Sequence, residues 1–297
     1  MAILIDQKSR ALVQGITGKI GAYQTQLMVE YGTNVVAGVT PGKGGQSTAG
    51  VPVFDTVAQA VEKTHPDVSI CFVPGPYACD AVIEAIECEL KLVVAVAEAV
   101  PLADAVRMLS YASQQGAYVL GPDTSGLISP GKCKLGVQPH RLFSEGHVGI
   151  VSRSGALSYE TAKMLTRNGL GQSTVIGLGG GPVWGFTYRD ALELFRKDND
   201  TQAVALLGEI GGHIEEEAAE YIKMGYPKPV VALVVGRSAP PGQKMGHAGA
   251  IIQQGKGSAQ DKIQKFSEAG ALIASSPKEI PAILKKEIRN QPQQNRL

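Results

Sequence analysis

One histidine stands in a loop whose composition favours exposure of its side chain. His247 lies in the segment Pro240–Ile251, with glycines at positions 246 and 249. The segment holds no second His, no Cys and no carboxylate, so it does not suggest a metal site. A neutral imidazole is a good nucleophile near pH 7 and can carry a covalent group. A loop histidine that only forms hydrogen bonds is the competing interpretation, and the rest of the chain decides between the two.

A glycine-rich turn near the N-terminus has the character of a phosphate cradle. Gly15–Gly21 follows a predicted strand and opens a predicted helix, with the spacing G-x-x-G-x-x-G. Free backbone amides at such a helix start favour an anion. The next strand, Asn34–Val39, is followed by Lys43, where a binder of NAD would place Asp or Glu. The lysine suits a phosphorylated ribose, as in NADP or coenzyme A; a structural turn beside a solvated lysine is the alternative.

Three further turns in the second half of the chain follow predicted strands. Ser152–Gly155 opens a helix and offers a second anion site, although a plain N-cap has the same composition. Gly177–Pro182, which includes Gly180 and Gly181, is rich enough in glycine for the backbone to approach a ligand. Glu209 stands among glycines and could hold the His247 ring by a hydrogen bond. Together these turns suggest phosphoryl or acyl transfer through a covalent histidine.

The elements that position these turns alternate between strand and helix. The predicted strands are 11–14, 34–39, 68–73, 92–96, 118–120, 148–152, 173–177, 203–207, 230–235 and 271–273; the predicted helices are 20–31, 57–63, 77–87, 102–115, 156–168, 188–195, 214–224, 259–269 and 278–288. This alternation predicts an α/β chain of two tandem doubly wound domains with mostly parallel sheets, Rossmann-like and then flavodoxin-like. We expect a first domain over 1–122, a connection with little periodicity over 123–146 and a second domain over 147–297.

Composition excludes several classes of protein. The 297 residues carry a net charge of +1, which gives no electrostatic reason for a nucleic-acid or membrane partner. No apolar run approaches the roughly 20 residues of a membrane span, and the first residues lack an export signal. The four cysteines form no CxxC pair or disulfide framework, which favours a cytoplasmic location. No Walker A pattern is present, so a phosphoryl group that reaches His247 must come from elsewhere.

Five segments in one order resemble a known family. They are Gln14–Gly18, Gly38–Gly45, Gly149–Gly155, Gly208–Gly212 and Met245–Ile251. In these, and over nearly its whole length, the chain resembles the α subunits of succinyl-CoA synthetase and related nucleoside-diphosphate-forming acyl-CoA synthetases. The resemblance implies that the first domain binds coenzyme A, through the residues Thr17, Gly18, Lys19, Ile20, Lys43, Val96, Ala97 and Glu98. Pro74 follows the third predicted strand at the same sheet edge and could line the rest of this ligand.

The same resemblance implies a role for each residue of the second domain's site. His247 is the phosphorylated histidine and Glu209 its orienting partner. Ser154 and Gly155 hold the phosphate, and Tyr159 matches a position tied to the acid substrate. The family carries ATP or GTP, with Mg²⁺, on a separate β subunit of the ATP-grasp fold, in an αβ or (αβ)₂ assembly. The implied sequence is phosphorylation of His247, transfer to a carboxylic acid as an acyl phosphate, and attack by the CoA thiol.

Two segments depart from the family pattern. The family usually reads Gly-Gly-Asp-Pro where this chain has 179–182, followed by Trp184 and Arg189, and Gly-Pro-Asn-Cys-Pro-Gly where it has 121–126. The acid therefore stays open: succinate, or malate, citrate, itaconate or a sulfonated acid such as sulfoacetate. Arg189 could face a second anionic group or be solvated. An NADP-type oxidoreductase and a CoA-sensing protein without catalysis are the alternatives from other functional classes.

Overall fold

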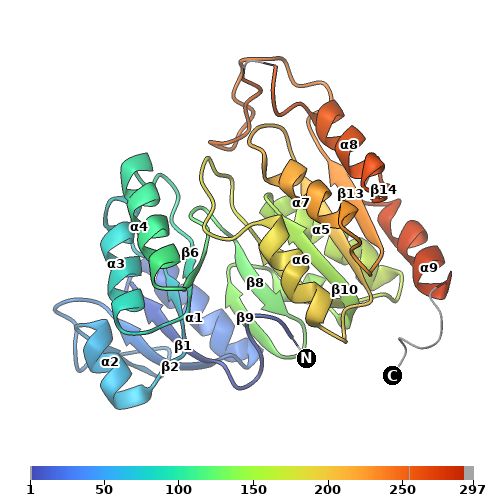
Figure 1. Cartoon of the computed structure of the whole chain (residues 1–297). Coiled ribbons are helices and arrows are strands. Elements are labelled where there is room, and N and C mark those ends of the chain that lie inside the picture. Colours follow the sequence, from blue (N-terminus) through green and yellow to red (C-terminus); the bar gives the residue numbers. More distant parts are fainter. Residues whose placement is uncertain (1, 254, 291–297) are drawn as a thin grey trace.

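The computed structural model describes residues 2–253 and 255–290. Figure 1 shows two α/β units side by side, with α1 to α4 around the first sheet at the left and α5 to α9 around the second at the right. Of the helices that the structure describes, none combines the length and apolar character that a membrane span requires.

The first sheet has the strand order β3-β4-β2-β1-β5-β6-β7. All neighbours are parallel except the short pair β3 and β4. The strand order reverses between β1 and β5, so this is the Rossmann-like arrangement that the sequence predicts. The elements are β1 (Arg10–Gln14), α1 (Lys19–Tyr31), β2 (Asn34–Val39), β3 (Ser47–Thr48), β4 (Val51–Phe54), α2 (Val57–Thr64), β5 (Val68–Cys71), α3 (Gly75–Glu87), β6 (Leu92–Ala95), α4 (Leu102–Gln114) and β7 (Tyr118–Leu120).

The second sheet has the strand order β14-β13-β12-β10-β11-β8-β9. Its parallel part, from β14 to β11, is the flavodoxin-like order, which reverses between β10 and β12. The elements are β8 (Gly126–Ser129), β9 (Cys133–Gly136), η1 (His140–Leu142), β10 (Glu145–Ser152), α5 (Gly155–Arg167), β11 (Gln172–Gly177), α6 (Tyr188–Lys197), β12 (Ala203–Gly208), α7 (Ile214–Lys223), β13 (Val230–Val234), α8 (Ala259–Glu268), β14 (Leu272–Ile273) and α9 (Ile280–Asn290).

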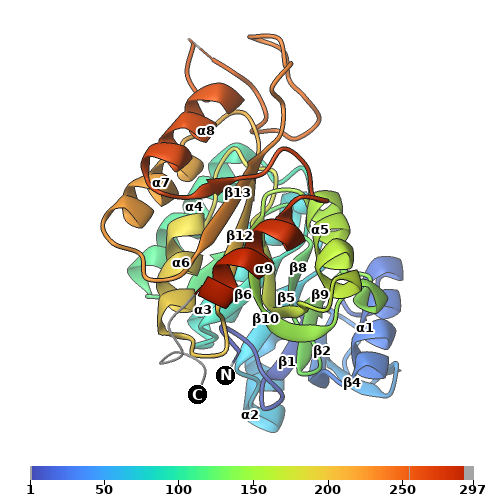
Figure 2. The same ribbon diagram turned by 90° about the vertical axis from the view of Figure 1, so that its right-hand side faces the viewer.

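Strand alternation explains how both sheets are covered on two faces. On β1, Leu12 packs with α2, α3 and α4, whereas its neighbours Ala11 and Val13 face the opposite side with Met28 of α1. In the second sheet, α5 and α9 cover one face and α6, α7 and α8 the other. Successive side chains of a strand point to opposite faces, so strands that are apolar throughout are buried on both. Figure 2 shows α5 and α9, the two helices that cover the same face of the second sheet.

The segment 123–146 differs from the connection that the sequence analysis expects. It contains β8 and β9, which pair with each other and extend the second sheet in antiparallel fashion from β11. Their turns are dense in glycine, and such short antiparallel strands carry little periodicity. The pair β3 and β4 is also absent from the predicted elements, for the same reason. The domain limits themselves stay a prediction.

One core continues from the first unit into the second. The buried cluster on the α1 face of the first sheet includes Val13 and Leu120 together with Leu135 of β9 and Val151 of β10. Polar contacts join the same surfaces: the Thr33 hydroxyl donates to the Lys134 carbonyl at 2.7 Å. The two units are therefore joined by a shared interior.

Candidate active site

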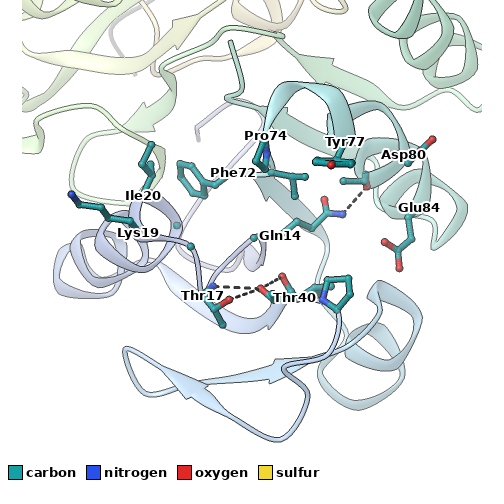
Figure 3. A pocket seen from close by; sticks show the side chains of 17 residues that line it. Gln14, Thr17, Lys19, Ile20, Thr40, Phe72, Pro74, Tyr77, Asp80 and Glu84 are labelled. Atoms are coloured by element: carbon teal, nitrogen blue, oxygen red, sulfur yellow. Dashed lines mark hydrogen bonds between the residues drawn. The ribbon is translucent and has the colours of Figure 1, made fainter. Parts of the chain in front are cut away.

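A cavity of about 800 Å³ opens at the carboxyl ends of β1, β2 and β5. It is lined by Gln14, Gly15, Thr17, Gly18, Lys19, Ile20, Gly21, Val39, Thr40, Pro41, Phe72, Val73, Pro74, Tyr77, Asp80, Ala81 and Glu84, and Figure 3 shows these side chains around it. The cavity lies where the strand order reverses, the usual ligand position in such sheets. The structure thus brings together five of the residues predicted for coenzyme A: Thr17, Gly18, Lys19, Ile20 and Pro74.

The floor of this cavity is a turn that only glycine permits. Gly15 has φ +76°, and a Cβ there would lie 3.2 Å from the backbone of Phe72. A Cβ on Gly21 would collide with the Gly15 carbonyl. Helix α1 begins at Lys19, within this turn, and its N-cap, Gly18, forms no side-chain cap hydrogen bond. The first amides of α1 therefore remain available for a phosphate.

Hydroxyl and amide groups complete the wall. The Thr17 hydroxyl and backbone N–H both face the Thr40 hydroxyl, at 3.2 and 3.4 Å. The Gln14 amide donates to the Ala81 carbonyl at 2.6 Å (Figure 3). Tyr77, Asp80 and Glu84 were not among the predicted binding residues. Their spacing along α3 places them on one helical face, which a periodicity analysis of the residues after β5 could have found.

The other predicted CoA residues lie outside this cavity. Lys43 is exposed in the loop between β2 and β3, where the Gly44 N–H donates to Asp55 at 2.8 Å. Val96, Ala97 and Glu98 follow β6, further along the same sheet edge. A long ligand anchored in the cavity would pass these residues on its way to the second sheet.

His247 meets Glu209 at the carboxyl edge of the second sheet. The His247 Nδ1 lies 2.9 and 2.8 Å from the two Glu209 carboxylate oxygens. Glu209 follows β12 directly, and its side chain is 8% exposed, whereas that of His247 is 35% exposed. Because Nδ1 donates to the carboxylate, Nε2 is left as the unprotonated, nucleophilic nitrogen of the neutral ring.

The pair also changes the basicity of the ring. The hydrogen bond that His247 donates to Glu209 raises the pKa of His247 above its ordinary value. Burial acts in the opposite sense, and the charges of Glu209 and Asp123 raise the pKa further while Arg153 lowers it. The imidazolium form therefore persists to a higher pH than in a free histidine.

Buried charged side chains contact Glu209 and hold it in place. The Arg153 Nη2 lies 3.1 Å from Glu209, and its Nη1 lies 3.1 Å from Glu215. Lys262 pairs with Glu215 at 2.6 Å, and the side chains of Arg153, Glu215 and Lys262 are all fully buried. Arg153 and Lys262 also donate to the Gly211 carbonyl, at 2.7 and 2.6 Å. We call Arg153, Glu215 and Lys262 the buried charge cluster; it fixes the turn that carries Glu209.

The sequence analysis missed the buried charge cluster. Arg153 comes from the turn after β10, Glu215 from the first turn of α7 and Lys262 from α8. Burial lowers the pKa of Arg153, but the charges of Glu215 and Glu209 outweigh it, so the net direction is upward. Glu215 stands in a run of three glutamates, which in sequence is typical of a solvated helix face.

The predicted phosphate residues lie at the start of α5. Ser154 is the N-cap of this helix, and its hydroxyl accepts from the Leu157 N–H at 3.3 Å. Gly155 lies against Tyr159, since a Cβ on it would be 3.2 Å from the Tyr159 hydroxyl. Burial raises the pKa of Tyr159, which remains a neutral hydrogen-bonding group. Ser154 thus has the N-cap function that the sequence analysis gave as the alternative, and the turn still presents helix amides.

Gly180 and Gly181 lie against the histidine loop. The Gly249 N–H donates to the Gly180 carbonyl at 2.9 Å, and a Cβ on Gly180 would be 2.9 Å from the His247 ring. The Trp184 indole fills the space that a side chain on Gly181 would need. The same ring covers the Arg153 guanidinium at 4.7 Å and donates to the Gly179 carbonyl at 3.0 Å. Trp184 therefore packs over the Arg153 end of the buried charge cluster.

Arg189 does not belong to this site. Its guanidinium lies 5.9 Å from the ring centre of Tyr221, on the side where α6 meets α7. The structure gives no support to a role in binding a second anionic group of the acid. Among the described residues, no group of three or more His, Cys, Asp or Glu is arranged to hold a metal ion.

Two family models match most of the chain. Residues 6–99 match the model of the CoA binding domain and residues 151–272 that of the CoA-ligase. The chain is 48% identical to the succinate–CoA ligase (ADP-forming) subunit alpha of Aquifex aeolicus, over 97% of this chain and 95% of that protein. It belongs to that family. The corresponding subunit of Staphylococcus aureus is 46% identical, over 96% of this chain and 94% of that protein.

Solved structures show the same fold. The ATP citrate lyase of Methanosaeta concilii superposes with a TM-score of 0.91 at 24% identity, over 99% of this chain and 52% of that one. The ATP citrate lyase of Methanothrix soehngenii gives 0.89 at 25% identity, over 98% and 52%. This chain therefore corresponds to about half of each of those longer chains. The predicted fold class, family and enzyme class, an alpha subunit of an acid–thiol ligase, are confirmed. The oxidoreductase alternative has no support.

Proposed function

We propose that this chain relays a phosphoryl group through His247 to succinate and then forms the thioester with coenzyme A. The observation that carries the proposal is the His247–Glu209 contact, which engages Nδ1 and leaves Nε2 as the nucleophilic nitrogen at the carboxyl edge of the second sheet. The membership of the succinate–CoA ligase alpha family supports the choice of succinate over the other acids.

The partner in this proposal is an ATP-grasp β subunit that holds ATP, or GTP, with Mg²⁺. Nε2 of His247 attacks the terminal phosphorus, the Nε2–P bond forms, and the nucleoside diphosphate leaves. Glu209 keeps the Nδ1 proton and stabilises the positive charge that develops on the ring. The amides at the start of α5, with Ser154 and Gly155, face the phosphoryl group.

The remaining steps use the acid and coenzyme A. A succinate oxygen attacks the phosphorus, the Nε2–P bond breaks, and succinyl phosphate forms. The CoA sulfur then attacks the acyl carbon, the C–O bond to phosphate breaks, and inorganic phosphate leaves. The nucleotide part of coenzyme A occupies the cavity that includes Thr17–Ile20 and Pro74, Lys43 lies near its ribose phosphate, and residues 96–98 guide the thiol arm towards His247.

The test is labelling of the two-subunit enzyme with γ-³²P-ATP. We expect an acid-labile, base-stable label on the wild-type chain and none on His247→Asn, whose ligase turnover falls by at least ~10⁴-fold, as for loss of a nucleophile. CoA affinity of the variant stays near normal, because His247 lies outside the cavity. Unchanged turnover in His247→Asn would contradict the proposal. A panel of dicarboxylates, hydroxyacids and sulfonates tests the acid, with succinate expected to be the fastest.

A further inference from the structure

Trp184, the single tryptophan of the chain, lies among the turns that build the second sheet's site. Its indole N–H donates to the Gly179 carbonyl at 3.0 Å. A Cβ on Gly181 would overlap the ring. The ring also lines a hollow of about 610 Å³ together with Gly249, which belongs to the loop that carries His247. The indole is therefore held in one position, next to that loop.

The ring covers a guanidinium that lacks hydrogen-bond acceptors on one side. The Arg153 Cζ lies 4.7 Å from the centre of the Trp184 ring. The Arg153 Nη1 donates to the Gly211 carbonyl at 2.7 Å and to Glu215 at 3.1 Å. Its Nε and Nη2 are buried and have no acceptor among the described residues. The negative face of the indole therefore compensates the burial of this side of the cation.

The side of Arg153 without acceptors is also the side that meets the histidine site. The Arg153 Nη2 lies 3.1 Å from the Glu209 carboxylate, in an ion pair that lacks the direction of a hydrogen bond. The same Nη2 lies 3.0 Å from the Cβ position of Gly249, so the loop that carries His247 packs directly against it. An ion pair without direction does not fix the guanidinium, and the Trp184 ring supplies the missing restraint.

The departure from the family pattern at position 181 is linked to this tryptophan. The pattern has Asp there, whereas this chain has Gly181, with φ +72°, a conformation that Asp also tolerates. The Trp184 ring occupies the space into which a side chain at position 181 would extend. Pro182 Cα and the Arg153 Nη2 lie 3.3 and 3.0 Å from one point, the Cβ position of Gly249, so a carboxylate at position 181 would start beside the same guanidinium.

We propose that Trp184 is a positioning residue that replaces the family's aspartate at position 181 and holds the Arg153 guanidinium against Glu209. The inference rests on the proposed function. Arg153 in turn keeps Glu209 directed at the His247 Nδ1, so that Nε2 stays free to attack phosphorus. A carboxylate would restrain the guanidinium but also compete with Glu209 for its charge, whereas the neutral ring restrains it without that competition.

The first test compares two variants of Trp184 in the two-subunit enzyme with γ-³²P-ATP. Trp184→Leu removes the π face, and Trp184→Phe keeps a smaller one. We expect the rate of His247 phosphorylation to fall about 10- to 30-fold in Trp184→Leu, as for loss of one desolvated cation–π contact, and less than about fivefold in Trp184→Phe. Tyr23→Leu is the matched control, because Tyr23 is 63% exposed on α1 and does not line the CoA cavity; its rate should stay within about twofold of wild type.

The pH dependence gives a readout that separates positioning from general loosening. Arg153 lowers the pKa of His247, so a guanidinium that shifts away lets this pKa rise. Only the neutral ring attacks phosphorus, and the acidic limb of the phosphorylation rate should therefore move to higher pH in Trp184→Leu. General loosening would separate His247 from Glu209 and move the limb to lower pH. Trp184→Phe should keep the wild-type limb.

Exchange with the family's aspartate is the second test, and it decides the matter if Trp184→Leu fails to fold. Gly181→Asp alone should lose phosphorylation, because its side chain overlaps the indole. The double variant Gly181→Asp with Trp184→Ala should be phosphorylated at least about tenfold faster than Trp184→Ala alone, since the carboxylate again restrains Arg153. Its acidic limb should lie above that of wild type, because an added anion raises the pKa of His247.

Three results would overturn the inference about Trp184. A wild-type rate and limb in Trp184→Leu, or a limb that moves to lower pH, would remove the tryptophan from the positioning of Arg153. A double variant no faster than Trp184→Ala would contradict the exchange with position 181. Retention of full turnover by His247→Asn is a different result, which contradicts the phosphohistidine relay itself.

Discussion

The carboxyl edges of the two sheets are built from different materials. The cavity of the first sheet is lined by the glycine turn 15–21, which includes Lys19, and by the Thr17 and Thr40 hydroxyls, while Lys43 is exposed outside it. At the second sheet, His247, the residue proposed to carry the phosphoryl group, contacts Glu209, which the buried charge cluster holds. The difference teaches that a binding edge can be made by backbone shape, whereas an edge that transfers a group needs charges fixed in orientation before the ligand arrives.

The largest expected effect falls on the buried charge cluster. Glu215→Gln leaves Arg153 and Lys262 buried with a neutral amide, and breaking one partner of a buried ionic network costs about 3–5 kcal/mol. Chemical denaturation of the chain should show this loss in the free energy of unfolding. Glu217→Gln, on the same helix but paired with the exposed His213, is the control and should cost below about 1 kcal/mol. Equal losses would mean that the cluster adds nothing to stability.

A smaller effect is expected at the contact with the reactive ring. Glu209→Gln should lower the rate of His247 phosphorylation about 100-fold at its plateau, because the ring loses its orientation and the charge that stabilises it. The pH profile should also move. Glu209 raises the pKa of His247, and only the neutral ring attacks phosphorus, so we expect the acidic limb of the wild-type profile at higher pH than for a free histidine.

The Glu209 variant should shift that acidic limb to lower pH. Rapid-quench labelling with γ-³²P-ATP measures both the plateau rate of His247 phosphorylation and the position of the acidic limb. The pH range runs from about 5 to about 8, on either side of the ordinary histidine pKa of ~6.5. A limb that stays in place, or moves to higher pH, would show that another group controls the titration. CoA affinity of the same variant, measured by calorimetry, serves as the internal control and should not change.

The smallest effect is expected on the first sheet's edge. Lys43→Ala should weaken coenzyme A about 5- to 10-fold, since an exposed cation contributes modestly, and should weaken dephospho-CoA less. Lys91→Ala removes an exposed lysine from the opposite edge, before β6, and should change neither affinity. Equal losses for the two ligands in Lys43→Ala would contradict its place near the ribose phosphate.

The sequence predicts the parallel strands and the reversal of strand order well, because fully buried strands read as continuous apolar runs. It predicts poorly where the chain is polar or rich in glycine. Strands β8 and β9 lie in such a segment, and their pairing with β11 depends on contacts that no local pattern reports. The contact between His247 and Glu209 is anticipated because both stand in turns at one sheet edge.

The supporting charges could not be predicted in the same way. Lys262 lies in a segment of α8 with many polar residues, and nothing local distinguishes a buried lysine from a solvated one. Its burial depends on Glu215, some 47 residues earlier, and on the Gly211 carbonyl.

One apolar interior joins the two units, from Val13 and Leu120 to Leu135 and Val151. This interior limits which parts of the molecule can move during the reaction. A hinge motion between the two sheets would expose this apolar interior to solvent. We therefore do not expect the two units to close around their ligands as rigid bodies. The distance between the two sites must instead be covered by two flexible parts. One is the pantetheine arm of coenzyme A, whose nucleotide end stays bound, and the other is the loop that carries His247. The two units then stay fixed relative to each other while only these small tethered groups move between them.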